Sequence, residues 1–232
     1  MYDWLILLVD LSQAVAKGRG MVEDLDRERI AMAADRLSNG ERFLSAIETI
    51  DQINEADPNR ISVSGIEISY ELHFSRLLFE KALHLREDAS EALLLAARSQ
   101  HICRWEMPRG DYPEGRAGYL RWRADLKRFH ADRTASILSD LGYDEETIQS
   151  VRTINLKQDL KGNPECQTME DALCLVFLEF QFPEFRRKTD DEKMVSILRK
   201  TWAKMSDQGR QAALGLKLGE DETRLVGMAL EG

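Results

Sequence analysis

Four polar residues capable of chemistry lie where helical periodicity would place apolar side chains. They are His73, His101, His130 and Asp171. His101 continues the spacing of Leu94 and Ala97, and Asp171 precedes Leu175 by one helical turn, so both side chains are expected to point inward. Imidazoles and carboxylates contributed by several helices form the metal sites of helical bundles. The pattern therefore predicts a site for a divalent metal, with Mn, Mg, Zn or Fe as the candidates.

Each of these residues also has a purely structural explanation. An inward histidine is commonly a hydrogen-bonded core residue. Thr168 is the expected N-cap of the helix that carries Asp171, so this carboxylate can stabilise the first helical turn or pair with a buried arginine. His84 shares a helix face with His73 but is roughly 16 Å away along the axis, so we expect it at the surface.

Residues 98–133 concentrate positive charge in an acidic chain. They carry eight arginines and one lysine against five acids, an excess of four positive charges in a protein of net charge −9. A planar guanidinium matches the oxygens of phosphate or carboxylate, so the segment predicts binding of a small phosphorylated or other anionic compound. Arg104, Arg109 and Arg133 are the expected ligands. Ion pairing along the helix, as between Arg121 and Asp125, is the alternative.

Aromatic and acidic residues in the same region extend this prediction. Trp105 and Tyr112 could stack on a ring of the bound compound, although large rings are first of all core material. Glu106 or Glu170 is the candidate general base. Stacking on single-stranded nucleic acid is a further possibility for these rings.

The elements that must position these residues are nearly all helical. Apolar spacing predicts helices over 41–57, 70–85, 91–107, 119–142, 144–159, 168–182 and 190–205, with a short helix or tail at the end. Ser90 or Asp88 is the expected N-cap of the third helix, and Pro108 its expected end. Residues 60–69 alternate apolar and polar side chains and predict a short strand pair. Residues 107–118, rich in proline and glycine, predict a functional loop.

Composition narrows the class of protein. A content of 43% hydrophobic and 31% charged residues is ordinary for a folded chain. The negative charge argues against binding double-stranded nucleic acid over a whole face. Cys103, Cys166 and Cys174 form no paired motif, and no signal peptide or membrane span is apparent, so a cytoplasmic protein is expected. Residues 1–18 are interpreted as an amphipathic helix.

Several quoted stretches resemble known families. His73 with Arg76 and Leu77, the helix ending in "ARSQHI", "FHADRTASILSDLGYDEETIQSVRTI" and "MEDALCL" resemble the HD-domain metal-dependent phosphohydrolase superfamily over about residues 70–180. In that superfamily a histidine, a His-Asp doublet and a late aspartate ligate one or two metals. Gln100-His101 stands at the position of the doublet.

A closer resemblance, over about residues 41–216, is to a family known as a domain of unknown function, DUF4202. The stretches that carry it are "QHICRWEMPRGDYP", "GYLRWR", "QTMEDALCLVFLEFQF" and "ILRKTWAKMS". This family brings no established activity with it.

Together these observations predict an all-α, HD-like bundle with an N-terminal helical extension over 1–40, a main domain over 41–216 and a C-terminal helix or tail over 217–232. The expected function is metal-dependent hydrolysis of a small phosphorylated or other anionic compound. An HD-like di-iron oxygenase and a non-catalytic module that binds an anion or a partner are the alternatives. The last alternative predicts that the three histidines and Asp171 are scattered in space.

Overall fold

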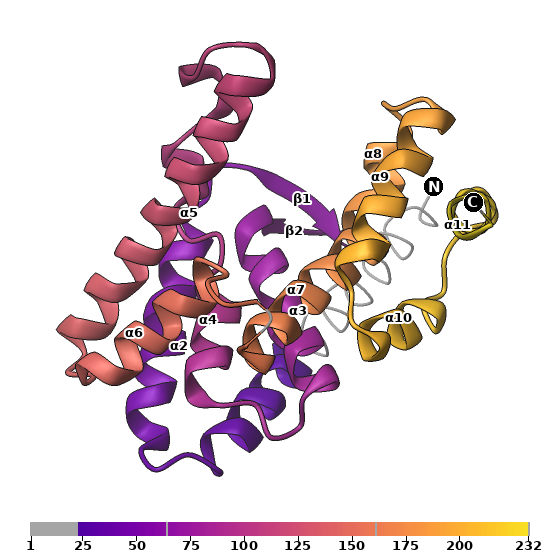
Figure 1. The fold of residues 1–232 in the computed structure, drawn as a ribbon. Helices are drawn as coiled ribbons and strands as arrows, with labels where there is room; N and C mark the ends of the chain where they lie inside the picture. Colours follow the sequence, from indigo (N-terminus) through magenta and orange to yellow (C-terminus); the bar gives the residue numbers. More distant parts are fainter. Residues whose placement is uncertain (1–22, 64, 161, 232) are drawn as a thin grey trace, which may run out of the picture.

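A computed structural model describes residues 23–63, 65–160 and 162–231, and these residues form a mainly helical molecule (Figure 1). The predicted all-α class is confirmed. The N-terminal elements are a helical stretch over 23–34, α2 (Gly40–Glu55), β1 (Arg60–Val63), β2 (Ile66–Ser69), α3 (Tyr70–Leu85), α4 (Glu91–Ser99) and the short 3₁₀ turns η1 (Arg104–Glu106) and η2 (Arg109–Asp111). The remaining elements are α5 (Gly115–Asp140), α6 (Glu145–Asn155), α7 (Pro164–Val176), the π-helical segment η3 (Phe177–Gln181), α8 (Phe182–Arg186), α9 (Asp191–Lys204), α10 (Asp207–Leu214) and α11 (Glu220–Leu230).

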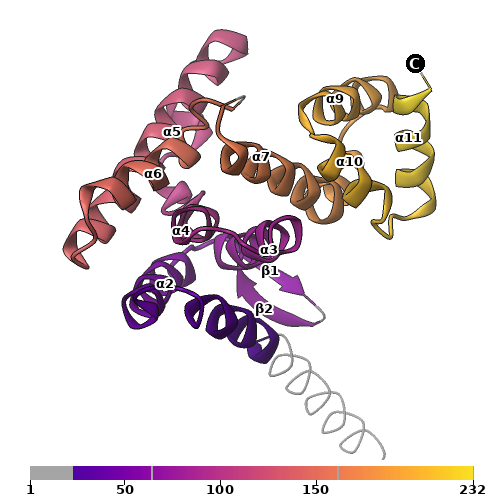
Figure 2. The same cartoon turned by 60° about the horizontal axis from the view of Figure 1, so that its bottom comes forward.

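Helices α3, α4 and α7 form the centre of the molecule. α3 packs against both α4 and α7, while α4 packs on α6 and α6 on α5. Every residue of α4 after Glu91 is buried, which makes it the core helix. Two arms extend from this centre, one formed by α5 with α6 and the other by the C-terminal part of α7 with α8 to α11 (Figures 1 and 2). The arms are therefore supported by the same three central helices.

The predicted strand pair and most of the predicted helix starts are confirmed. β1 and β2 form an antiparallel hairpin in which Val63 pairs with Ile66, and Gly65 has a φ of +81°, which favours glycine. Ser90 caps α4 by accepting a hydrogen bond from the N–H of Leu93. These local signals are read correctly from the sequence because they depend only on neighbouring residues.

The predicted end of α4 is wrong. The helix ends at Ser99 instead of continuing to Pro108. His101 therefore lies in the turn that follows and not on the helix. The chain then passes through Cys103, whose φ of 55° is in the left-handed region, before η1 begins at Arg104. A left-handed turn ends helical periodicity, although the apolar spacing continues beyond it.

The predicted start of α7 is also wrong. Asn163, and not Thr168, is its N-cap, because the Asn163 side chain accepts hydrogen bonds from the N–H groups of Glu165 and Cys166. Pro164 occupies the first helical position, where its fixed φ is favourable and no N–H is needed. Asp171 consequently lies two turns into the helix and outside the reach of the N-terminal dipole.

A buried ion network joins the N-terminal helices to α4. The guanidinium of Arg98 has no exposed surface and donates to both carboxylate oxygens of Asp26 and of Asp51, at 2.6 to 2.9 Å. Its central carbon lies 5.5 Å from the ring centroid of Phe79. Asn54 donates to the backbone carbonyl of Arg98. These contacts tie α4 to α2, α3 and the stretch 23–34.

Residues 23–34 form a helix, and its Ile30 and Ala33 side chains are buried in the hydrophobic core. The first part of the predicted extension, including the amphipathic helix expected over 1–18, lies outside the described residues. At the other end of the chain, α11 packs on α9.

Replacing Arg98 with methionine is expected to destabilise the fold strongly, because the half-buried Asp51 would lose its cation and the buried Asp26 would keep only Arg76, at 3.3 Å. Removal of one partner of a buried ion pair costs about 3 to 5 kcal/mol. Urea unfolding monitored by circular dichroism measures the free energy of unfolding. Arg27→Met is the control, because the Arg27 side chain is 77% exposed. A loss below about 1 kcal/mol for Arg98→Met would contradict the proposed importance of the network.

Candidate functional site

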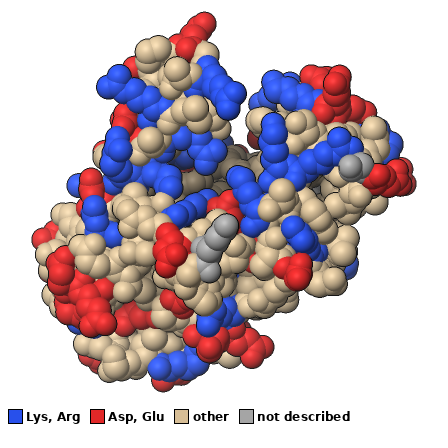
Figure 3. Space-filling model, viewed as in Figure 1, with Lys and Arg blue, Asp and Glu red and all other residues tan. Residues whose placement is uncertain are grey.

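A cleft of about 810 Å³ opens between the two arms. Its lining comes from β1, α3, the turn after α4, η1 and α5 on one side, and from α7, η3, α8 and α9 on the other, with Lys157 at the end of α6. Lys and Arg side chains gather on both sides of this hollow (Figure 3). The volume is in the range of small-molecule sites.

The cleft is positively charged although the protein is acidic. Six lining residues are cationic and two are acidic, an excess of four positive charges. The cations are Arg104, Arg123, Lys127, Lys157, Lys188 and Lys204, and the acids are Glu170 and Glu184.

Three of these cations form the cluster that we call the α5 locus: Arg104, Arg123 and Lys127. Within the described parts of the chain, no carboxylate lies within ion-pairing distance of Arg123 or Lys127. Burial, and then the neighbouring charges of Lys157 and Arg123, lowers the pKa of Lys127. The positive charge of this locus is thus unbalanced.

Arg104 has one acidic neighbour, Glu71, whose carboxylate oxygen lies 3.7 Å from the arginine Nε. Burial raises the pKa of Glu71 to about 8, although Arg104 opposes the shift. Near pH 7 the carboxyl group is therefore mostly protonated and does not neutralise the arginine. The guanidinium also lies over the ring of Trp122, 5.2 Å from its centroid.

A second cluster, the α7 locus, comprises Glu170 and Lys204 on the opposite side of the cleft and Lys157 from the turn after α6. Both lysines form ion pairs with the buried Glu170, at 3.5 Å in the case of Lys204. Although burial raises the pKa of Glu170, the two lysines lower it below its ordinary value. The carboxylate is thus a weak base, which argues against its predicted role as general base. Lys157 has a φ of 52°, a left-handed conformation that costs about 1 to 2 kcal/mol in a non-glycine residue.

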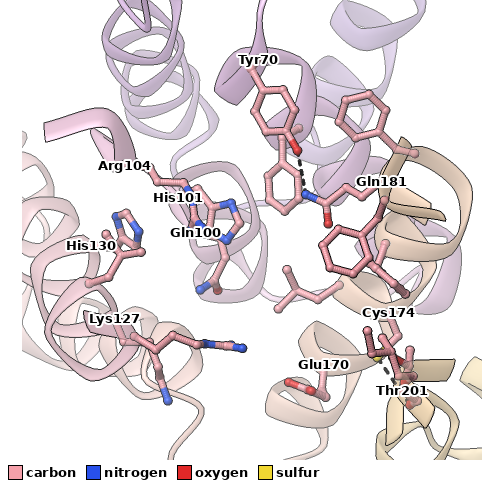
Figure 4. A pocket seen from close by; sticks show the side chains of 18 of the residues that line it. Tyr70, Gln100, His101, Arg104, Lys127, His130, Glu170, Cys174, Gln181 and Thr201 are labelled. Atoms are coloured by element: carbon pink, nitrogen blue, oxygen red, sulfur yellow. Dashed lines mark hydrogen bonds between the residues drawn. The ribbon is translucent and has the colours of Figure 1, made fainter. Parts of the chain in front are cut away.

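Neutral polar groups form the end of the cleft beside the α5 locus. Gln100, His101 and His130 lie together there, with Arg104 next to them (Figure 4). The ring centroids of His101 and His130 are 5.7 Å apart, and His101 stacks on Phe74 at 4.2 Å. The sequence prediction brought these two histidines together correctly.

Hydrogen bonding defines the state of His130. Its Nδ1 lies 2.7 Å from the carbonyl oxygen of Ile102 and must donate, because a carbonyl only accepts. Nε2 therefore carries a lone pair, and it is buried without a hydrogen-bond partner among the described residues. Burial, and then His101, lowers the pKa of His130 to about 3, while burial and nearby cations lower that of His101 well below its usual value. Both imidazoles are neutral at pH 7.

Aromatic residues cover much of the remaining surface of the cleft. The seven rings are those of Tyr70, Phe74, Tyr119, Trp122, Phe177, Phe180 and Phe185. Phe177 and Phe180 belong to the π-helical segment η3, a conformation that is frequent at functional sites. Gln181 at the end of η3 donates to the hydroxyl of Tyr70 and so joins the two sides of the cleft.

The predicted four-residue metal site is not formed. Asp171 lies elsewhere and holds the start of α10, where its oxygens accept from the backbone N–H and the hydroxyl of Ser206. A Cβ on Gly209 would come within 2.6 Å of the Asp171 Cγ, so the carboxylate is enclosed. His73 packs edge-on against Phe180. In the described part of the chain, no group of three His, Cys, Asp or Glu side chains is placed to hold a metal. The di-iron alternative depended on the same ligands, which the described residues do not bring together.

Other predicted site residues lie outside the cleft lining. Glu106 and Arg133 are exposed beside Cys103. Arg109 donates to the carbonyls of Tyr112 and Pro113 and thus stabilises its own loop. Trp105 packs against the core, and Tyr112 interacts with Asp125. His84 is exposed, as predicted.

Sequence reasoning counted Arg123 and Lys127 in the positive segment and considered Trp122 as a stacking ring, but it chose none of them as expected ligands, and it missed Lys157 and Lys204. The first three had a further signal, because they lie at helical spacing from His130 on the same face of α5. Lys157 and Lys204 had none, since their common partner Glu170 is distant in the sequence from Lys204.

Comparisons with known proteins agree with the closer of the two resemblances. The family model described as a domain of unknown function (DUF4202) matches residues 44–226. The chain belongs to this family. No curated protein and no solved structure matches it. The DUF4202 match includes the whole cleft, whereas the HD resemblance stays a prediction. None of the described helices combines the length and apolar character needed to cross a bilayer.

Glu71→Gln is expected to change how stability depends on pH. In the unfolded chain the carboxyl group releases its proton near pH 4.5, whereas the folded protein retains it up to about pH 8. Between these values the unfolded state binds fewer protons, so the free energy of unfolding falls as pH rises. The variant has no carboxyl group to titrate at this position. Between pH 6 and pH 8 the free energy of unfolding of the wild type should therefore fall by about 2 kcal/mol relative to that of the variant.

Chemical denaturation at several pH values measures this difference. Glu67→Gln, at an exposed position on β2, is the matched control and should follow the wild-type profile. A constant difference between Glu71→Gln and the wild type across the range would refute the buried, protonated state of Glu71.

Proposed function

We propose that the cleft binds a small phosphorylated compound. The observation that carries this proposal is the α5 locus, in which Arg123 and Lys127 lack a carboxylate partner in the described chain while Arg104 faces a mostly protonated acid. Crowded cations in a partly buried cleft are unfavourable on their own. A bound anion offsets this cost and raises the pKa of Lys127.

The arrangement of side chains favours a small molecule over a polymer. The positive charge is confined to a cleft of about 810 Å³ in a protein of net charge −9. Guanidinium groups bind phosphate through paired hydrogen bonds, and the aromatic walls suit an organic body attached to the phosphate. This proposal is common to the hydrolase and the non-catalytic binding module that the sequence predicted.

Arg123→Gln and Lys127→Gln are each expected to weaken binding of a phosphomonoester about tenfold, because each removes one charged hydrogen-bond donor. Isothermal titration calorimetry with phenyl phosphate, adenosine 5′-phosphate and fructose 6-phosphate provides the measurement. Arg121→Gln removes the same charge from the exposed face of α5, where the side chain is 76% exposed, and should leave affinity unchanged. Equal losses in all three variants, or no binding of any probe by the wild type, would refute the proposal.

Hydrolysis of the bound ester is the second candidate, favoured by the neutral imidazole of His130 with its unpartnered Nε2. This nitrogen can accept a hydrogen bond from a water and orient the water oxygen toward phosphorus; the proton that the attacking water loses passes to solvent, and the leaving oxygen takes a proton from solvent.

His130→Gln then separates binding from turnover. If the candidate holds, the wild type releases inorganic phosphate from one of the same three esters and the variant does so at least 100-fold more slowly. Calorimetry should show the affinity of the variant for that ester within about threefold of the wild type, because the α5 locus is unchanged. Absence of phosphate release by the wild type would leave the protein as a binding module.

A further inference from the structure

The charge of the cleft exceeds what one phosphate group can neutralise. The excess of four positive charges comes from three cations in the α5 locus and from one surplus lysine in the α7 locus, since Lys188 is paired with Glu184. A phosphomonoester carries about −1.5 to −2 at neutral pH. Two phosphoryl groups carry about −3 to −4, which matches the excess.

The surplus charge comes from two adjoining parts of the cleft, since the charge of Lys157 also acts on Lys127. Figure 4 shows Lys127 on one side of the pocket and Glu170 with Thr201 on the other. Lys157 and Lys204 both pair with Glu170, so one carboxylate serves two cations. One lysine of the α7 locus is therefore available to an anion without leaving Glu170 unpaired.

The backbone supports a specific role for the α7 locus. Lys157 and Asp159 both have left-handed φ values, 52° and 55°, in the turn that follows α6. Two such residues are retained only where surrounding structure requires them, and strained positions concentrate at functional sites. The turn is what directs Lys157 toward Glu170 and the cleft.

We propose that the ligand is a small bisphosphorylated compound, with one phosphoryl group bound by the α5 locus and the other by Lys157 and Lys204. This inference rests on the proposed function and specifies its ligand. The organic part of the compound would lie between the loci, along the aromatic wall that includes Trp122 and Phe177.

Matched pairs of ligands test the number of phosphoryl groups. The pairs are fructose 6-phosphate with fructose 1,6-bisphosphate, 3-phosphoglycerate with 2,3-bisphosphoglycerate, and adenosine 5′-phosphate with adenosine 3′,5′-bisphosphate. Calorimetry on the full chain should show at least one bisphosphate binding 30-fold or more tightly than its partner. Values within threefold for all pairs would overturn the inference, even if every monophosphate binds.

Lys204→Gln tests the location of the second phosphoryl group. This substitution should reduce bisphosphate affinity about tenfold and leave monophosphate affinity within twofold. The Lys204 side chain is 55% exposed and Lys157 still neutralises Glu170, so the fold should be unaffected. Lys200→Gln, an exposed lysine of the same helix outside the cleft, is the control.

The outcomes separate the two proposals. Loss of monophosphate binding in Arg123→Gln supports the proposed function whatever the bisphosphates do. An equal loss for both members of a pair in Lys204→Gln would overturn the second phosphoryl site. Tighter binding of a 20-nucleotide oligothymidylate than of any bisphosphate, with the same dependence on Lys204, would overturn the small-molecule assignment in favour of single-stranded nucleic acid.

Discussion

The buried guanidinium of Arg98 is the interaction on which the rest of the structure depends. A cation without exposed surface is tolerated only when its charge and its N–H groups are satisfied, and Asp26 and Asp51 do both. These carboxylates come from the stretch 23–34 and from α2, so they hold α4 against both. Two residues after Arg98, Gln100 begins the turn that brings His101 and Arg104 into the cleft. A charge balance in the core thus orients the candidate site.

The cations of the cleft have fewer carboxylate partners than the cation in the core. Arg98 has two carboxylate partners, whereas Arg123 and Lys127 have none among the described residues. The same contrast holds for the neutral groups, because the Nε2 of His130 is buried without a partner. The same fold pairs the buried guanidinium of Arg98 completely, whereas Arg123, Lys127 and the Nε2 of His130 are left without such partners in the described part of the chain. The anionic ligand proposed above would supply oxygens to the two cations, whereas Nε2 needs a donor such as a hydroxyl group or a water.

Sequence periodicity located most helices but not all of their ends. Apolar spacing identified α2, α3 and α9, because an amphipathic helix repeats its signal over several turns. It placed the end of α4 beyond Ser99, since the left-handed turn at Cys103 leaves no mark in the apolar pattern. In the site, it brought His101 and His130 together but also included Asp171. That carboxylate serves the start of α10 through Ser206, a partner 35 residues further along the chain.

The sequence by itself determined the helical class, the DUF4202 membership and the local excess of positive charge, because these follow from composition, spacing and motifs along the chain. The tertiary structure alone decided which cations are unbalanced. Ion pairing depends on distance in space, and the partners here are far apart in sequence, as for Arg104 with Glu71 and Lys204 with Glu170. Burial, which sets the protonation of Glu71 and His130, is likewise a property of the packed molecule.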